Sequence, residues 1–152
     1  MKQFEKGLRL TKNRAEKEKM FLKKYAKLGT ELKGRDRYGQ NALQMFSCTF
    51  DFHLTNFSNE EKTSIAEILL KKSADFNIDI NEANSGNFNA FHTACFENNI
   101  KLVEVIIDLA ESMNFNLKAK TSLGLTGFEI AENLGHQNIV NMIQRKLPVG
   151  EY

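Results

Sequence analysis

The sequence contains very little proline or cysteine and has no long apolar segment. Its 152 residues include one proline, two cysteines and no tryptophan. The absence of a run of about 18 apolar residues argues against a transmembrane helix. Residues 1–6 are followed by charged residues rather than by the apolar region of a secretory signal peptide, so we expect no such signal. Two cysteines in such a chain are expected to be reduced thiols, which predicts a cytoplasmic or nuclear protein.

The sequence also lacks the common catalytic motifs. It has no glycine-rich phosphate-binding loop, no HExxH and no Gly-x-Ser-x-Gly. The paired carboxylates Glu60-Glu61 fall at an expected helix start, where capping explains them. We therefore predict that the protein is not an enzyme, has no cofactor and takes no small-molecule substrate.

Charge is unevenly distributed along the chain. The net charge is +2, but residues 1–37 hold 13 basic and 5 acidic side chains, whereas residues 38–152 hold 8 and 14. The first segment is therefore +8 and the second −6. Such asymmetry is compatible with binding of nucleic acid or an anionic surface by residues 1–37. It is equally compatible with a solvated helix face lying near acidic repeats, because residues 3–32 are free of proline and rich in helix formers.

A recurring pattern carries the most information about the fold. Asn89-Ala90-Phe91-His92-Thr93-Ala94 precedes the apolar pair Leu102-Val103, and Thr126-Gly127-Phe128-Glu129-Ile130-Ala131 precedes Ile139-Val140 at the same spacing. The two copies start 37 residues apart. Each copy predicts a turn, a short helix, a second turn and a second helix. Self-similarity at this period is typical of stacked helix pairs.

Local signals set the expected limits of these helices. In the first copy we expect a helix over roughly 90–97, interrupted by Asn98-Asn99, and then a second helix. In the second copy Thr126 is the expected N-cap and Gly135 the expected left-handed C-terminal residue. The second helices should bury two apolar stripes: Leu102, Val103, Ile106, Ile107 and Ala110, and Ile139, Val140, Met142 and Ile143.

Residues 36–77 contain an earlier, modified copy. Here the interval from Asn41 to Ile65 is longer than the equivalent interval from Asn89 to Leu102, which implies an insertion. The insertion, residues 49–59, contains an apolar group that either forms a local mini-core or is exposed as a contact site. The members of this group are Phe50, Phe52, Leu54 and Phe57. Ser58-Asn59-Glu60-Glu61 has capping-box spacing and predicts that a helix restarts near residue 59.

These segments resemble the ankyrin repeat. Asn89 to Ala94 is similar to the family's T-P-L-H-x-A, and Gly135 to Val140 to its G-H-x-x-I-V. Ile65 to Asn77 is similar to I-V-x-x-L-L-x-x-G-A-D-V-N. The chain departs from the family in lacking the proline of T-P-L-H, in having Gln44 and Glu129 in place of its histidine, and in exceeding the usual period of about 33 residues.

The resemblance implies an all-α ankyrin-repeat solenoid with three repeats and a partial, capping N-terminal helical repeat. We expect a single domain over residues 1–152. Its parts would be the N-terminal unit 3–35, the repeat 36–77 with the insertion, the repeat 84–117 and the C-terminal repeat 121–147.

The resemblance also gives the histidine and cysteine side chains structural roles. It makes His92 a turn-stabilising, hydrogen-bonding residue and Cys95 a small core residue. The competing hypotheses are a His92–Cys95 nucleophilic pair and a zinc site formed with Cys48 and His53. The chain has no Cys-x-x-Cys pair, so we predict no metal site.

The implied function is protein–protein interaction through the concave face of the stack. The expected partner-binding residues are Arg37, Tyr38, Gln40, Ser85, Asn87, Phe88, Phe96, Glu97, Ser122, Leu123 and Leu125. Phe88 and Leu125 are equally compatible with packing between hairpins. We expect a monomer that binds another protein, with no membrane association; nucleic acid is the less favoured partner. Small proteins of this family act as regulators of signalling or transcription factors, or as host-directed effectors, and both roles stay open.

Overall fold

The computed structural model describes residues 37–48 and 58–152. The predicted helix 3–32, the N-terminal unit 3–35, His53 and most of the insertion lie outside these residues. Across the described ranges the chain forms helices joined by turns and loops and contains no strand. The all-α prediction is therefore confirmed for this part of the chain. No helix among the described residues is long and apolar enough to cross a membrane.

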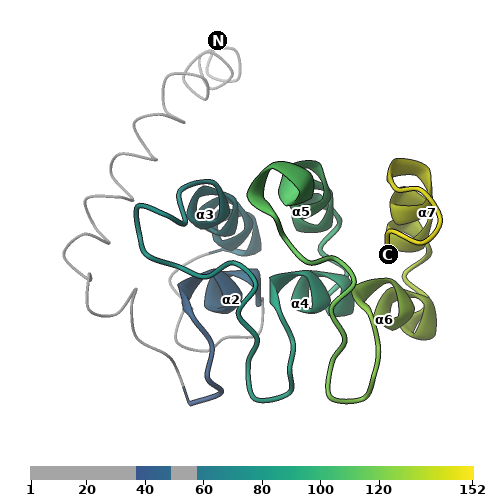
Figure 1. Ribbon diagram of the computed structural model, residues 1–152, viewed down its shortest axis with the longest axis horizontal. Helices are drawn as coiled ribbons and strands as arrows, with labels where there is room; N and C mark the ends of the chain where they lie inside the picture. Colours follow the sequence, from purple (N-terminus) through teal and green to yellow (C-terminus); the bar gives the residue numbers. More distant parts are fainter. Residues whose placement is uncertain (1–36, 49–57) are drawn as a thin grey trace, which may run out of the picture.

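In the part of the chain that the structure describes, six helices form three consecutive pairs. These are α2 (Ala42–Ser47) with α3 (Asn59–Lys71), α4 (Ala90–Phe96) with α5 (Ile100–Met113), and α6 (Gly127–Leu134) with α7 (Gln137–Lys146). The short helices α2, α4 and α6 form one row, and the helices α3, α5 and α7 form a second row beside it (Figure 1). Each helix contacts its own partner and the neighbouring helices of its row.

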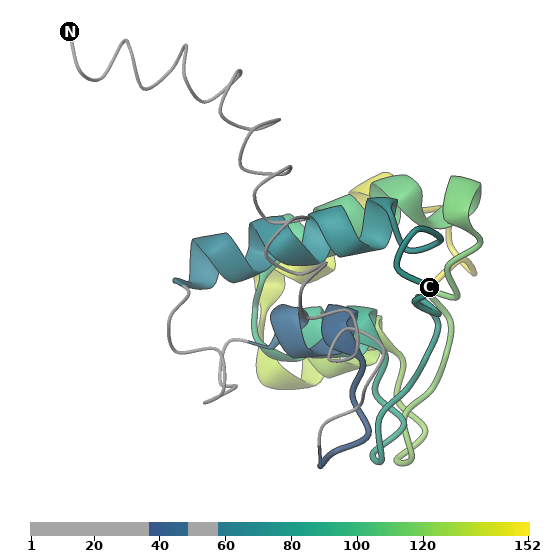
Figure 2. The same cartoon turned by 90° about the vertical axis from the view of Figure 1, so that its left-hand side faces the viewer.

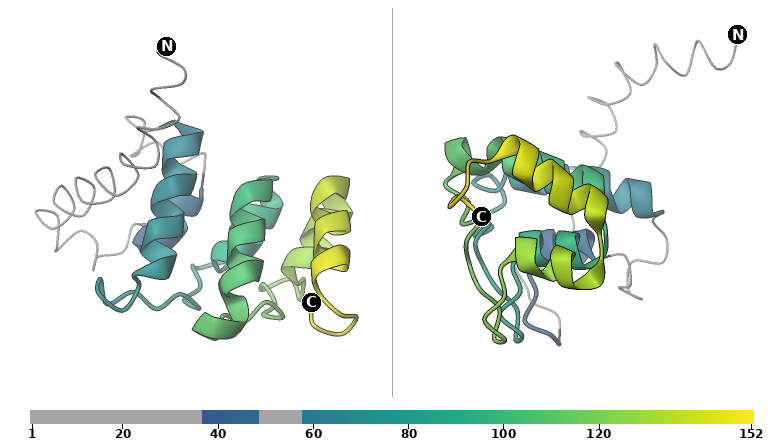
Figure 3. Two further views of the ribbon diagram at one scale, coloured as in Figure 1. Left: turned by 90° about the horizontal axis from the view of Figure 1, so that it is seen from above. Right: turned by 90° about the vertical axis from the view of Figure 1, so that its right-hand side faces the viewer.

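The loops before α2, α4 and α6 leave the helical layers along the same edge. Figure 2 shows them side by side, running away from both rows, and the right-hand view of Figure 3 shows the same arrangement from the opposite end. We call these loops the first (37–41), second (79–89) and third (116–126) hairpins. One edge of the molecule therefore carries three equivalent projections on a helical base.

The core lies between the two rows and follows the predicted stripes. In α5 the side chains of Leu102, Val103, Ile106, Ile107 and Ala110 are buried, and in α7 those of Ile139, Val140, Met142 and Ile143 are buried. Both predicted stripes are confirmed. The short helices contribute Leu43, Phe91 and Phe128 from equivalent positions. Burial of such apolar surface between neighbouring pairs is the main force that holds the rows together.

The predicted helix limits also agree with the structure. Thr126 caps α6, and the left-handed Gly135, at φ 73°, ends it. Ser58 caps α3 with Glu61 in a capping box. The break at Asn98-Asn99 is confirmed, because Asn98 adopts φ 58° and Asn99 accepts a hydrogen bond from the Leu102 N–H as the cap of α5. These signals are local in sequence, so they predict the helix ends without knowledge of the packing.

Candidate functional site

The three hairpins form the surface on which most of the predicted binding residues lie. The second and third are each closed by a backbone hydrogen bond, from Asn84 N to Phe88 O and from Thr121 N to Leu125 O, both 2.9 Å. Two residues before each helix cap the chain is left-handed, at Gly39 (φ 71°), Asn87 (φ 59°) and Gly124 (φ 78°). Glycine and asparagine tolerate this conformation better than other residues.

Backbone hydrogen bonds join neighbouring hairpin tips. The Ser85 N–H donates to the Tyr38 carbonyl at 3.0 Å, and the Ser122 N–H donates to the Gly86 carbonyl at 3.1 Å. Because the same bond recurs between successive tips, the position of each hairpin depends on its neighbour. The tips therefore form one connected surface rather than three independent loops.

Asparagine side chains add further links between the loops. Asn87 Nδ2 donates to the Lys120 carbonyl at 2.7 Å. Asn81 Nδ2 donates to the Asn114 carbonyl at 3.0 Å, and its Oδ1 accepts the Asn116 N–H at 2.7 Å. Each link spans about one repeat of sequence. Such fixed links reduce the number of conformations that a hairpin would lose on binding a partner.

The Asn87 link provides a test of hairpin rigidity. Asn87→Gly keeps the left-handed conformation but removes the bond to Lys120, so we expect a loss of about 1 kcal/mol in the free energy of unfolding. Asn87→Ala loses the bond and also replaces asparagine with a residue that tolerates the left-handed region less well, so its loss should be about 2 kcal/mol. Urea titration monitored by circular dichroism measures both. Equal stability of the glycine variant and wild type would contradict a stabilising link.

Each short helix begins with a reciprocal cap made by different residue types. Asn41 pairs with Gln44, Asn89 with His92 and Thr126 with Glu129. In each pair the third helical residue accepts the backbone N–H of the cap, at 2.8 Å for Gln44 Oε1, 2.9 Å for His92 Nδ1 and 3.1 Å for Glu129 Oε1. Gln44 and Glu129 stand at the position of His92 in their repeats and accept the same hydrogen bond.

His92 is held as a neutral imidazole. Its Nδ1 accepts the Asn89 N–H, so this nitrogen carries no proton, and Nε2 is left to donate to the Ala119 carbonyl at 2.7 Å. The side chain is 1% exposed, and burial lowers its pKa, an effect that the bond to Ala119 partly offsets. The predicted turn-stabilising role of His92 is confirmed by these bonds.

The structure gives no support to a His92–Cys95 nucleophilic pair. Cys95 is fully buried, and burial raises the pKa of its thiol, whereas a nucleophilic cysteine needs an accessible thiolate. The thiol of Cys48 donates to Glu97 Oε1 at 3.5 Å. In the ranges 37–48 and 58–152, no three His, Cys, Asp or Glu side chains come together in a way that could hold a metal ion.

The predicted binding residues differ in their exposure. Arg37, Tyr38, Ser85, Asn87, Phe96, Ser122 and Leu123 are exposed, and Phe88, Glu97 and Leu125 are half-buried. The prediction that Gln40 binds a partner is corrected, because Gln40 is only 7% exposed and offers little surface to a partner. It lies at the base of the first hairpin, directly before the buried cap Asn41. The hairpin base lies against the helices, which the hairpin pattern alone did not show.

Aromatic rings meet where the second hairpin faces α4. The Phe88 ring packs edge-on against His92, with centroids 5.7 Å apart, and against Phe96, at 6.2 Å. Phe96 is nevertheless 49% exposed. The alternative for Phe88 was packing between hairpins, whereas the structure packs its ring against His92 and Phe96 of α4. Phe88 therefore packs edge-on against the exposed ring of Phe96.

Leu134 is a surface residue that the sequence analysis missed. It lies at the C-terminal end of α6, 37 residues after Glu97, and is 47% exposed. The turn that follows it is joined to α4 by His136 Nε2, 3.1 Å from the Phe96 carbonyl. The repeat period could have identified Leu134, because it places this leucine at the position of the predicted Glu97.

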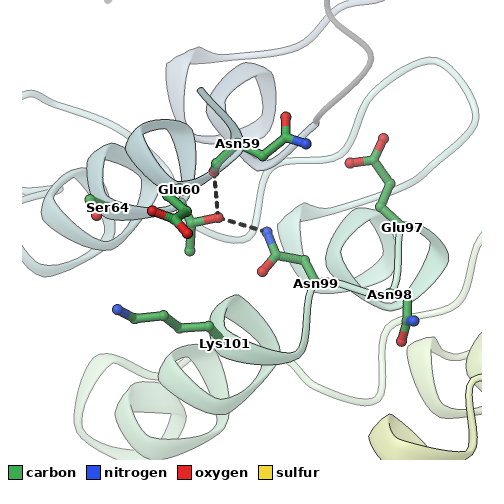
Figure 4. Close-up of a pocket in the computed structure, with 8 residues that line it drawn as sticks. Asn59, Glu60, Ser64, Glu97, Asn98, Asn99 and Lys101 are labelled. Atoms are coloured by element: carbon green, nitrogen blue, oxygen red, sulfur yellow. Dashed lines mark hydrogen bonds between the residues drawn. The ribbon is translucent and has the colours of Figure 1, made fainter. Parts of the chain in front are cut away.

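A polar groove of about 620 Å³ lies between the starts of α3 and α5. Figure 4 shows Asn99 of the α4–α5 turn pointing across the groove towards α3. Asn99 Nδ2 donates to Thr63 Oγ1 at 3.0 Å, and Thr63 Oγ1 donates to the Asn59 carbonyl at 3.0 Å. These side chains join neighbouring helix pairs, so we assign the groove a structural role.

No protein-family model matches the chain, and a search of curated proteins finds no match. The functional interpretation therefore depends on the geometry of the hairpins and the exposed side chains that they carry.

Proposed function

We propose that the protein is an ankyrin-type repeat stack that binds another protein through its hairpins and the neighbouring ends of its short helices. Two features support the ankyrin-type assignment: three helix pairs in two rows, and hairpins that leave one edge at each repeat (Figure 1). The sequence resemblance at Asn89 to Ala94 and Gly135 to Val140 is consistent with it.

One observation carries the functional proposal: large apolar side chains are exposed on a surface whose backbone is linked at every repeat. Tyr38 is 57% exposed, Phe96 49% and Leu123 84%. Tyr38 and Leu123 are on the first and third tips, and the second tip bonds to both hairpins through Ser85 and Ser122. Aromatic side chains on a rigid surface favour protein recognition, since little conformational entropy is lost on binding.

The proposal also covers catalysis, oligomeric state, cellular location and biological role. We propose that the protein is not an enzyme, because the buried histidine and cysteine already have structural roles. We also propose that it acts as a monomer in the cytoplasm or nucleus. A regulator of a signalling or transcription factor and a host-directed effector both agree with such a binding module. The identity of the captured protein would decide between them.

Two variants with matched chemistry test this surface. We expect Tyr38→Ala combined with Phe96→Ala to weaken partner binding at least tenfold, because truncation of an aromatic anchor commonly costs more than about 1 kcal/mol. The control is Val149→Ala, which removes an apolar side chain that is 93% exposed and lies outside the hairpins and the short helices. The control should bind like wild type.

The measurement has two steps. Wild-type protein captures its partner from cells of its source, and mass spectrometry identifies the captured protein; calorimetric titration of the purified pair then compares the variants. Unchanged circular dichroism spectra verify that both variants are folded. If the Tyr38/Phe96 variant binds as tightly as wild type, the hairpin surface is not the binding site.

A further inference from the structure

We propose that His92 is a pH-sensitive latch that holds the second hairpin, and with it Phe88, against the third hairpin. The proposal begins with position. His92 lies at the start of α4 and is bonded to Asn89 at the end of the second hairpin and to Ala119 in the third. Its ring also contacts Phe88, which packs against Phe96. One buried side chain thus connects a helix cap, two hairpins and the candidate binding surface.

The two hydrogen bonds of His92 require the neutral ring. If Nδ1 gains a proton, it becomes a donor that faces the Asn89 N–H, which is also a donor, so the bond is lost and two N–H groups oppose each other. The cationic ring would also be buried, with the Ala119 carbonyl as its remaining hydrogen-bond partner. Protonation therefore favours an open arrangement in which the ring reaches water.

The other repeats have caps that do not titrate near neutral pH. Gln44 makes the equivalent two bonds in the first repeat, with Oε1 accepting the Asn41 N–H and Nε2 donating to the Glu82 carbonyl at 2.8 Å. Glu82 lies 37 residues before Ala119, so the two acceptors are equivalent. In the third repeat, hydrogen bonds from Thr126, its backbone N–H first, lower the pKa of Glu129. Of these three caps, the one in the middle repeat is a histidine, the side chain whose ordinary pKa lies between pH 5 and 8.

The other charged groups near His92 are exposed or make hydrogen bonds elsewhere. On its own hairpin, Glu82 accepts Asn41 Nδ2 at 2.8 Å. In the third hairpin, Lys118 and Lys120 on either side of Ala119 are exposed. The titratable groups packed around α4 have other partners or are exposed. Cys48 donates to Glu97, Cys95 is a buried thiol, Glu129 bonds to Thr126, and His136 Nε2 lies 3.1 Å from the Phe96 carbonyl at the C-terminal end of α4. Lys101, Glu104, Asp108, Glu111 and Glu132 are exposed.

The direction of the pH effect follows from the burial of His92. Because the folded protein favours the neutral ring, the pKa of His92 in the closed latch lies below the ordinary value of about 6.5. The closed latch is fully stable above a pH of about 6.5, the ordinary pKa of histidine. It loses stability as the pH falls below this value, since the open form then binds the proton. The effect on partner binding depends on the function proposed above, whereas the latch itself does not.

Amide hydrogen exchange tests the latch without a partner. The reporters are three equivalent cap amides, Asn41, Asn89 and Thr126, measured by NMR at pH 7.5 and 5.0 and corrected for intrinsic exchange. We expect protection of the Asn89 amide to fall about tenfold or more at pH 5.0 while the other two stay constant. In His92→Gln, which copies Gln44, the Asn89 amide should also stay constant.

Each alternative outcome has a definite meaning. Constant protection of Asn89 in wild type overturns the latch, and so does an equal fall at all three amides or an equal fall in His92→Gln. The NMR chemical shifts of the Phe88 and Phe96 rings should change over the same pH range in wild type only. Unchanged shifts would overturn the claim that the latch holds Phe88 in place. A failed Tyr38/Phe96 binding test overturns the binding function but leaves the exchange result intact.

Discussion

Replacing His92 with alanine is expected to lower the free energy of unfolding by about 3 kcal/mol at pH 7.5. The substitution leaves the Asn89 N–H and the Ala119 carbonyl without partners in a buried region, at a cost of about 1–3 kcal/mol for each group. It also empties the volume of a side chain that is 1% exposed. The expected loss is a large fraction of the stability of a small domain.

The chain itself supplies the control for this prediction. His92→Gln should cost less than about 1.5 kcal/mol, because Gln44 makes the same pair of bonds in the first repeat. Urea titrations of both variants at pH 7.5, analysed with a common m value, measure the difference. If glutamine and alanine are equally destabilising, the hydrogen bonds of His92 are not the source of its contribution.

Replacing Gly127 with alanine is expected to destabilise the protein by about 1–2 kcal/mol, although alanine is the better helix former. A Cβ at Gly127 would lie 2.6 Å from Cδ2 and Cε2 of Phe91 and 3.2 Å from Cys95 Sγ. Phe91 is fully buried and packs against Phe115, so its ring has little room to move. Overpacking of this kind costs about 1–3 kcal/mol, more than the gain of up to about 1 kcal/mol from helix propensity.

The equivalent positions in the other repeats sharpen this test. Ala42 and Ala90 are the first residues of α2 and α4, so alanine is acceptable at this place in a helix when space allows. Phe91→Leu, which copies Leu43, should make room for the new methyl group. A double-mutant cycle by urea titration is expected to show favourable coupling between Gly127→Ala and Phe91→Leu. Strictly additive effects would mean that the Phe91 ring does not exclude the methyl group.

Much of the local structure was predictable because its signals lie within a few residues of each other. The cap Thr126, the left-handed Gly135, the break at Asn98-Asn99 and the buried stripe of α5 all agree with the sequence analysis. Most of the candidate surface was also predictable, since the repeat period identifies the hairpin tips. Tyr38 and Leu123 are exposed as expected for tip residues.

The helix pairs, their caps and their apolar stripes follow from the sequence alone, because a helix end or stripe depends on residues within one or two turns. Which hairpin residues are exposed and which pack against the protein depends on the tertiary structure. It buried Gln40, packed Phe88 against Phe96 and left Leu134 exposed. It also placed Gly127 of the third repeat against Phe91 of the second. These outcomes depend on how hairpins and helices pack against one another, which patterns within one or two helix turns do not specify.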